Sequence, residues 1–112
     1  MQFLTMSQRR TESFTDAEFA AHAEAEVQQA RVLYAEGFIR QIWHRNDVAG
    51  ACILVEADSE EQVREKLNTL PLMQKGMLAV SITPLRPYAG FGPRQASDGS
   101  EPGEFLADVE SR

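Results

Sequence analysis

The sequence predicts an α+β protein of the ferredoxin-like βαββαβ type, with a four-stranded antiparallel sheet and two helices on one face. Three observations lead to this prediction. A capped amphipathic helix follows a short apolar segment near the N-terminus, and two strand-like segments are then joined by only five turn-forming residues. A second capped helix precedes a last segment in which apolar and small residues alternate strictly.

Residues 2–7 are the first expected strand, because they form a short apolar run bounded by polar residues. The segment that follows, residues 8–13, is polar and is expected to be a solvated loop. Arg9 and Arg10 are therefore interpreted as surface charges.

The first helix has the clearest local signals in the chain. Thr15 and Glu18 have the spacing of a capping box, while Phe14 and Phe19 occupy the positions of a hydrophobic staple. Gly37 marks the end of the helix, because glycine accepts the left-handed conformation that follows a helix.

One apolar stripe runs along this helix at spacings of four, four, three and four residues, and it is expected to face the core. Its residues are Phe19, Ala23, Val27, Ala30 and Tyr34. His22 and Glu26 lie beside the stripe, at the expected boundary between core and solvent.

The second strand is expected over residues 38–45, and strict alternation divides it into two faces. One face carries Phe38, Arg40, Ile42 and His44, and the other carries Ile39, Gln41, Trp43 and Arg45. Residues 46–50 have turn chemistry and join it to a third strand at residues 51–57. The continuous apolar run of that third strand is typical of a strand covered on both sides.

Asp58 or Ser59 caps the second helix, with Ser59 and Gln62 in capping-box register, and Pro71 interrupts the pattern. The last strand is residues 77–85. Residues 1–86 therefore form one domain, and residues 87–112 form a tail that is expected to be extended or partly disordered. One apolar turn of the tail (Phe105, Leu106 and Val109) could dock on the core or on a neighbouring subunit.

Two helices can cover only one face of a four-stranded sheet, so the other face needs a second cover. We expect a homodimer in which two sheets pack face to face, with a larger homo-oligomer as a further possibility.

The net charge and the distribution of apolar residues exclude some classes of binding partner. The net charge of the 112 residues is −6, which argues against nucleic acid and against a membrane surface. No apolar run is long enough to span a bilayer, and residues 1–10 lack the apolar region of a secretory signal. A cytoplasmic location is therefore expected. Cys52 is the single cysteine, and its apolar surroundings indicate a buried, inert thiol.

The chain resembles the muconolactone delta-isomerase family over roughly residues 1–86. The resemblance is carried by the pair Glu36 and Gly37, by Arg40 and Trp43 at successive steps of three residues, and by the run Leu70, Pro71 and Leu72. It implies a dimeric α+β barrel without a cofactor. It also implies proton-transfer isomerisation, with a C=C shift, of a small anionic unsaturated lactone or a related compound of aromatic catabolism. His44 stands where members of the family commonly carry a basic residue.

Isomerisation of such a lactone needs a cation for the carboxylate, an apolar wall and a base. Arg40 is the expected carboxylate clamp, because its planar fork matches a carboxylate. Trp43 is expected in the core or in the wall, and Tyr34 is a further substrate-binding residue.

The candidate bases are His44, His22 and Glu26, with His44 favoured because an imidazole changes its charge near neutral pH. No spacing of metal ligands, phosphate loop or nucleophile motif is present in the sequence. We therefore expect no metal and no cofactor.

Two alternatives remain open. One is a cofactor-independent oxygenase of the same barrel type that acts on an electron-rich aromatic compound. The other is a non-catalytic dimer that binds a small ligand or stabilises a partner, and its barrel would be filled with side chains.

Overall fold

The computed structural model describes residues 1–90. Its elements are β1 (Gln2–Arg9), α1 (Asp16–Ala35), β2 (Ile39–His44), β3 (Ala51–Glu56), α2 (Glu60–Leu67), α3 (Pro71–Gln74) and β4 (Leu78–Pro84). The predicted order of strands and helices is confirmed, and α3 is an additional turn of helix. The tail beyond residue 90, with the apolar turn expected at residues 105–109, lies outside the described residues.

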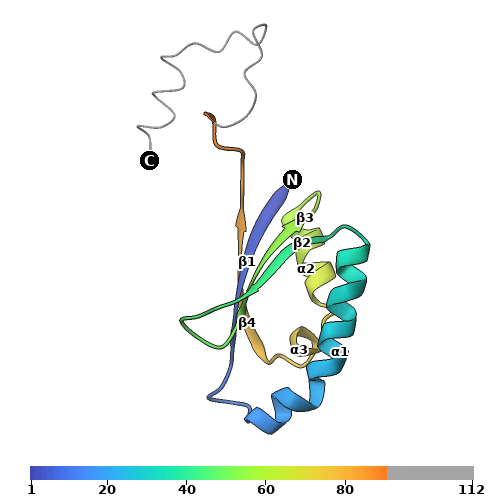
Figure 1. Ribbon diagram of the computed structural model, residues 1–112, viewed down its shortest axis with the longest axis vertical. Coiled ribbons are helices and arrows are strands. Elements are labelled where there is room, and N and C mark those ends of the chain that lie inside the picture. The colour runs from blue at the N-terminus through green and yellow to red at the C-terminus, as the bar shows by residue number, and fades with distance from the viewer. Residues whose placement is uncertain (91–112) are drawn as a thin grey trace, which may run out of the picture.

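The four strands form one antiparallel sheet in the order β2-β3-β1-β4. Helices α1, α2 and α3 all lie on the same side of this sheet, with α1 as the outermost element (Figure 1). The ferredoxin-like α+β prediction is therefore confirmed for the protomer. Within residues 1–90, no helix is long and apolar enough to cross a membrane.

The predicted boundaries of α1 are confirmed by its caps. The Thr15 side chain accepts a hydrogen bond from the Glu18 amide, and Glu18 accepts one from the Thr15 amide. The rings of Phe14 and Phe19 meet edge to face with centroids 6.1 Å apart, which forms the staple. Gly37 has φ of +87°, so its lack of a side chain allows the chain to leave the helix at this point.

The second helical region is divided in two. Ser59 is the N-cap of α2 and accepts a hydrogen bond from the Gln62 amide. Pro71 does not simply interrupt the helical pattern, because it begins the separate turn α3. Proline suits the first helical position, where its fixed φ is already helical and the missing N–H has no partner to lose.

A β-bulge in β2 changes the two faces that alternation predicts. Ile39 pairs with Val55 and Gln41 pairs with Leu54, so two steps along β2 correspond to one step along β3, and Arg40 is the extra residue. Ile42 and His44 then pair with Ile53 and Ala51.

Because of the bulge, Ile39, Ile42 and His44 share the face that is turned toward the helices. The prediction that Ile39 lies on the face opposite to Ile42 is therefore wrong. Trp43, which pairs with Cys52, lies on the face away from the helices, as predicted relative to Ile42 and His44.

The apolar core consists of two separate clusters. The larger cluster joins β1, β2 and β3 to α2 and to the C-terminal half of α1, and includes Phe3, Leu33, Val55, Val63 and Leu67. The smaller cluster joins the N-terminal end of α1 to α3 and β4 through Phe19, Leu72 and Met77. The space between the two clusters holds the candidate site.

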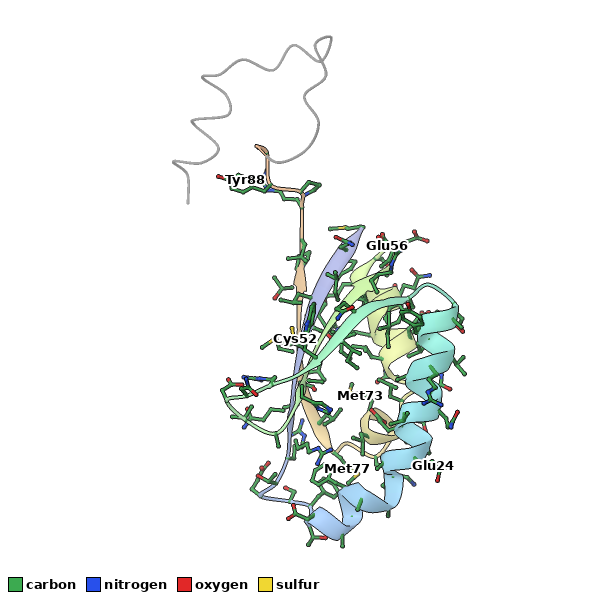
Figure 2. The ribbon with its side chains drawn as sticks, viewed as in Figure 1. Glu24, Cys52, Glu56, Met73, Met77 and Tyr88 are labelled. Carbon is green, nitrogen blue, oxygen red and sulfur yellow. The ribbon has the colours of Figure 1, made fainter. Side chains whose placement is uncertain are left out.

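No described helix covers the other face of the sheet. Leu4, Met6, Cys52 and Leu54 alternate with the core residues of β1 and β3 and are only partly buried there. In Figure 2, Cys52 lies on the side of the sheet away from α1. The expected burial of its thiol is thus incomplete in the protomer.

Candidate functional site

A cavity of about 770 Å³ lies between the helix-facing side of the sheet and helices α1 and α3. Its floor is formed by β1, β2, β3 and β4, and its outer wall is formed by α1. Met73 on α3 lies between α1 and the sheet, whereas Glu24 lies on the outer side of α1 (Figure 2). One protomer supplies all of these walls. Its size falls within the range of roughly 300–1,000 Å³ that is common for small-molecule sites.

The apolar stripe of α1 lines this cavity. All five of its residues contribute to the lining: Phe19, Ala23, Val27, Ala30 and Tyr34. The prediction that this stripe packs in the core is wrong, because only Phe19 among them is buried, while Val27 and Tyr34 are 50% and 66% exposed.

Polar contacts join α1 to the region of α2 and α3. The Gln29 side chain donates to the Thr69 hydroxyl over 2.8 Å, and Lys66 donates to the Glu36 carboxylate over 2.8 Å. These bonds fasten the middle and the end of the helix to the α2–α3 region. The apolar stripe of the helix faces the cavity.

Glu26 is the acidic group of the cavity. One of its oxygens, Oε1, accepts a hydrogen bond of 2.9 Å from the Leu72 amide, while no group of residues 1–90 donates to Oε2. Burial raises the pKa of Glu26 above its usual value. The Leu72 amide and the charges of Arg9 and His22 oppose this rise in part. A carboxylate with a raised pKa and a free oxygen can accept a proton from a bound molecule.

The other two predicted bases are placed differently. His44 is exposed and lines the cavity from the end of β2. His22 is partly buried on α1 but is not part of the lining, and its described contact with the site is its electrostatic effect on Glu26.

Arg9 is a site residue that sequence reasoning missed. Strand β1 continues to Arg9 and is two residues longer than predicted, so Arg9 follows Phe3, Thr5 and Ser7 on the helix-facing side. Its guanidinium lies 4.9 Å from the centroid of the Phe19 ring, and it lines the cavity. The signal in the sequence was the two-residue alternation, which continues beyond the apolar run.

A second arginine is fixed at the same end of the cavity. Arg45 donates to both carboxylate oxygens of Asp47, over 2.9 and 2.6 Å, and its third donor reaches the Ser7 carbonyl over 3.2 Å. The hydrogen bonds from Arg45 lower the pKa of Asp47 to about 2. Because both of its carboxylate-facing nitrogens are bonded to Asp47, Arg45 supplies positive potential to the cavity. No hydrogen bond from the Arg9 side chain to residues 1–90 is present, so its donors can bind an anion.

The turn between β2 and β3 depends on a glycine. A Cβ atom at Gly50 would lie 2.0 Å from the Ser7 carbonyl oxygen, so no other residue fits without moving the backbone. The Arg45 amide donates to the Gly50 carbonyl and the Arg9 amide donates to the Ala49 carbonyl. This close approach brings Arg9, His44 and Arg45 to one end of the cavity.

Of the predicted substrate-binding residues, Tyr34 lines the cavity and Arg40 does not. Trp43 borders the cavity at the edge strand β2, although its register with Cys52 places it on the opposite face of the sheet. Arg40 is exposed at the bulge, and no carboxylate among residues 1–90 forms an ion pair with it. Trp43 is 47% exposed, so it is not a core residue of the protomer. In the described part of the chain, no three His, Cys, Asp or Glu side chains gather closely enough to hold a metal ion.

The sequence matches the family model of muconolactone delta-isomerase over residues 1–90. The chain belongs to this family. None of the curated proteins matches the sequence.

Among solved structures, the fold is similar to that of 5-chloro-2-hydroxyhydroquinone dehydrochlorinase from Burkholderia phenoliruptrix, in complex with 2,5-dihydroxybenzoquinone. The two chains are 19% identical, with a TM-score of 0.57, and the match covers 77% of this chain and 94% of the other. At this identity the likeness shows the shared fold.

Membership of the muconolactone delta-isomerase family agrees with the local structure of the matched motifs. Glu36 and Gly37 end α1, and Leu70, Pro71 and Leu72 form the start of α3 that supplies the hydrogen bond to Glu26. The family assignment and the cavity together support the conversion of a small molecule.

Proposed function

We propose that this protein is an isomerase that moves a proton within a small anionic unsaturated lactone or a related product of aromatic catabolism. The observation that carries the proposal is Glu26, a partly buried carboxylate that faces an apolar cavity with one oxygen held and the other free. Membership of the muconolactone delta-isomerase family supports the same reaction class.

In the proposed reaction, Glu26 removes a proton from a ring carbon next to the C=C bond. The electrons spread over the conjugated carbonyl system, and Glu26 returns the proton to the far end of that system. The C=C bond shifts by one position and no electron leaves the substrate. A partly buried base beside an apolar wall suits this internal transfer.

The cationic end of the cavity fits the carboxylate of such a substrate. Arg9 offers free donors, while Arg45 and His44 lie beside it at the same end. Phe19 lies beneath the Arg9 guanidinium and limits its movement, which favours a fixed position for the bound anion. In this proposal Arg9 takes the role that the sequence suggested for Arg40.

The test is exchange of carbon-bound hydrogen in muconolactone dissolved in D2O, followed by NMR. The wild-type protein should catalyse both exchange and isomerisation, and Glu26→Gln should slow both by roughly 10²–10⁴-fold. Gln keeps an oxygen that can accept the Leu72 amide, so the variant should fold normally. Arg40→Gln is the matched control outside the cavity and should retain wild-type exchange.

The proposal is refuted if Glu26→Gln exchanges hydrogen as fast as the wild type, or if the wild type exchanges hydrogen neither in muconolactone nor in a ring-substituted analogue of it. Oxygen uptake with candidate phenols in the same preparations would instead support the oxygenase alternative. A homodimer formed through the uncovered sheet face is part of the proposal, as is the absence of any cofactor.

A further inference from the structure

The cavity is longer than a single lactone ring requires. Its lining residues on α1 extend from Phe19 to Tyr34, which is about 22 Å of helix at 1.5 Å per residue. A lactone with a carboxymethyl arm is about as long as two extended residues, or roughly 7 Å. Such a ligand would fill only part of a cavity of about 770 Å³.

The two ends of the cavity differ in chemistry. Across the sheet, His44, Ala51 and Ser7 lie in one row, and Arg9 and Arg45 are at the same end. The next row toward the other end is formed by Ile42, Ile53 and Thr5, whose hydroxyl donates to the Ile53 carbonyl over 3.3 Å. Ile39 beside Val55 forms the row after it.

The far end is bounded on one side by the larger core cluster, to which Leu67 and Leu70 belong, and is open to solvent at Tyr34, which is 66% exposed. Leu67, Leu70 and Ala30 line it, and Tyr34 lies at its rim. Arg31 is the charged residue of this part of the lining, and it is exposed to solvent. The far end is therefore suited to an uncharged, apolar group.

Glu26 lies between the two ends. It is seven residues from Phe19 and eight from Tyr34 along α1, so the base is near the middle of the wall. An anion held by Arg9 would place the next few atoms of the ligand beside Glu26. Any further part of the ligand would then enter the apolar end.

We propose that the substrate carries an apolar substituent, of the size of an aryl ring, on the side of the lactone remote from its carboxylate. This inference rests on the proposed function and adds the substrate class. The carboxylate binds at the Arg9 end, and the reacting ring lies at Glu26. The substituent packs against the exposed apolar side chains of Tyr34 and Ile42, beside Ala30.

The test compares muconolactone with an analogue that bears a phenyl group on the ring side remote from the carboxymethyl arm. Dissociation constants are measured by calorimetry on Glu26→Gln, which prevents turnover. The phenyl analogue should bind roughly tenfold or more tightly, because its ring leaves water for an apolar surface.

Two variants locate the effect. Tyr34→Ala and Ala30→Leu, each made in the Glu26→Gln background, should reduce the ratio of the two dissociation constants. Ala30→Leu acts by filling the far end of the cavity. Val32→Ala is the matched control, because Val32 is 48% exposed on the same helix and is not part of the lining. Since Tyr34 is largely exposed, its truncation tests the proposal even if Ala30→Leu does not fold.

Equal affinity for the two ligands, or an unchanged ratio in Tyr34→Ala and in a folded Ala30→Leu, would overturn this inference. The proposed reaction is judged separately by hydrogen exchange in the wild type. Exchange of muconolactone without preference for the phenyl analogue contradicts only the substrate class. Tighter binding of the analogue without exchange of either ligand contradicts only the reaction.

Discussion

Glu26 combines two properties that usually oppose each other. Burial raises its pKa and so disfavours the carboxylate, while the Leu72 amide, Arg9 and His22 favour it. The result is a group that takes up a proton more readily than an exposed glutamate and still has a fixed orientation. This balance defines how the protein should respond to pH.

We predict that the acid limb of the kcat/KM profile follows Glu26 and lies above the pH at which an ordinary glutamate titrates. The base must be ionised to act, so activity falls as pH falls through its raised pKa. The pKa itself can be measured by NMR titration of the Glu26 carboxyl carbon. An acid limb at or below the value of an exposed glutamate would contradict this assignment.

The contribution of Glu26 to folding stability depends on pH in the opposite direction to its contribution to activity. A folded-state pKa above the unfolded value means that the folded protein binds the proton more tightly, so this contribution to stability is lost as pH rises through the folded pKa. Glu26→Gln removes the cost of burying a charge. The melting temperature of the variant should therefore gain on that of the wild type as pH rises from about 4 to 7, in paired thermal unfolding scans.

Arg9 is predicted to determine affinity for the anionic part of the ligand. Arg9→Gln should raise KM, or the dissociation constant of muconolactone, by roughly ten- to a hundredfold, because a hydrogen bond to a charged group is lost. Arg40→Gln changes the same charge at an exposed position outside the cavity and serves as the control. Equal effects of the two substitutions would indicate general charge attraction and not a site at Arg9.

Several site residues could be predicted from sequence, and the reason differs for each. Glu26 and His44 were visible as titratable groups beside apolar patterns, and both line the cavity. Arg9 was assigned to a loop because the apolar run of β1 ends before it, although the strand does not. The planar fork of Arg40 and the family pattern favour it as the carboxylate clamp, but neither reveals which way a residue points at a bulge.

At the scale of elements, the helices were predictable because their ends are encoded locally. Thr15 and Gly37 act through bonds and dihedral angles within a few residues of themselves. The position of α1 relative to the sheet was not predictable from the sequence. It depends on contacts between distant segments, such as Gln29 with Thr69 and Glu26 with Leu72. An apolar stripe predicts that one face of the helix lies in an apolar environment, but it does not distinguish a packed core from the wall of a cavity.

The β2–β3 turn predicts how much stability is lost when Gly50 is replaced, and Gly37 provides the comparison. Gly50→Ala would force the Ser7 backbone to move and should cost about 3 kcal/mol of stability, the upper part of the range for overpacking. Gly37→Ala meets no atom within 4 Å and suffers only from its φ of +87°, so it should cost about 1 kcal/mol. Chemical denaturation of both variants measures the difference, and a smaller loss for Gly50→Ala than for Gly37→Ala would contradict this account.

At the scale of the whole molecule, the uncovered face of the sheet bears on assembly. Leu4, Met6, Cys52 and Leu54 are partly buried there without a helix above them, and Trp43 is half exposed on the same face. A contiguous apolar surface of this kind is typical of an interface. The expected homodimer would cover it.

We predict that the protein sediments as a dimer or a larger multiple, and that Leu54→Lys shifts it toward the monomer. A lysine at this position would be buried without a partner in a face-to-face dimer, whereas it would be solvated in a monomer. Analytical ultracentrifugation over a range of protein concentrations measures the shift. Val32→Lys introduces the same residue on the outer surface of α1 and should leave the mass unchanged.

The division of the apolar core has a consequence for cooperativity. Phe19 fastens one end of α1 to the smaller cluster and Leu33 fastens the other end to the larger one, while the sheet side of the helix between them faces the cavity. The two clusters are connected through the backbone of this helix, through the strands beneath it, and through the α3 region, where Leu70 belongs to the larger cluster and Leu72 to the smaller one. A ligand long enough to contact both clusters would couple them, so that they unfold together. Slower amide exchange across the middle of α1 would then report occupancy of the cavity, because binding turns two units of folding into one.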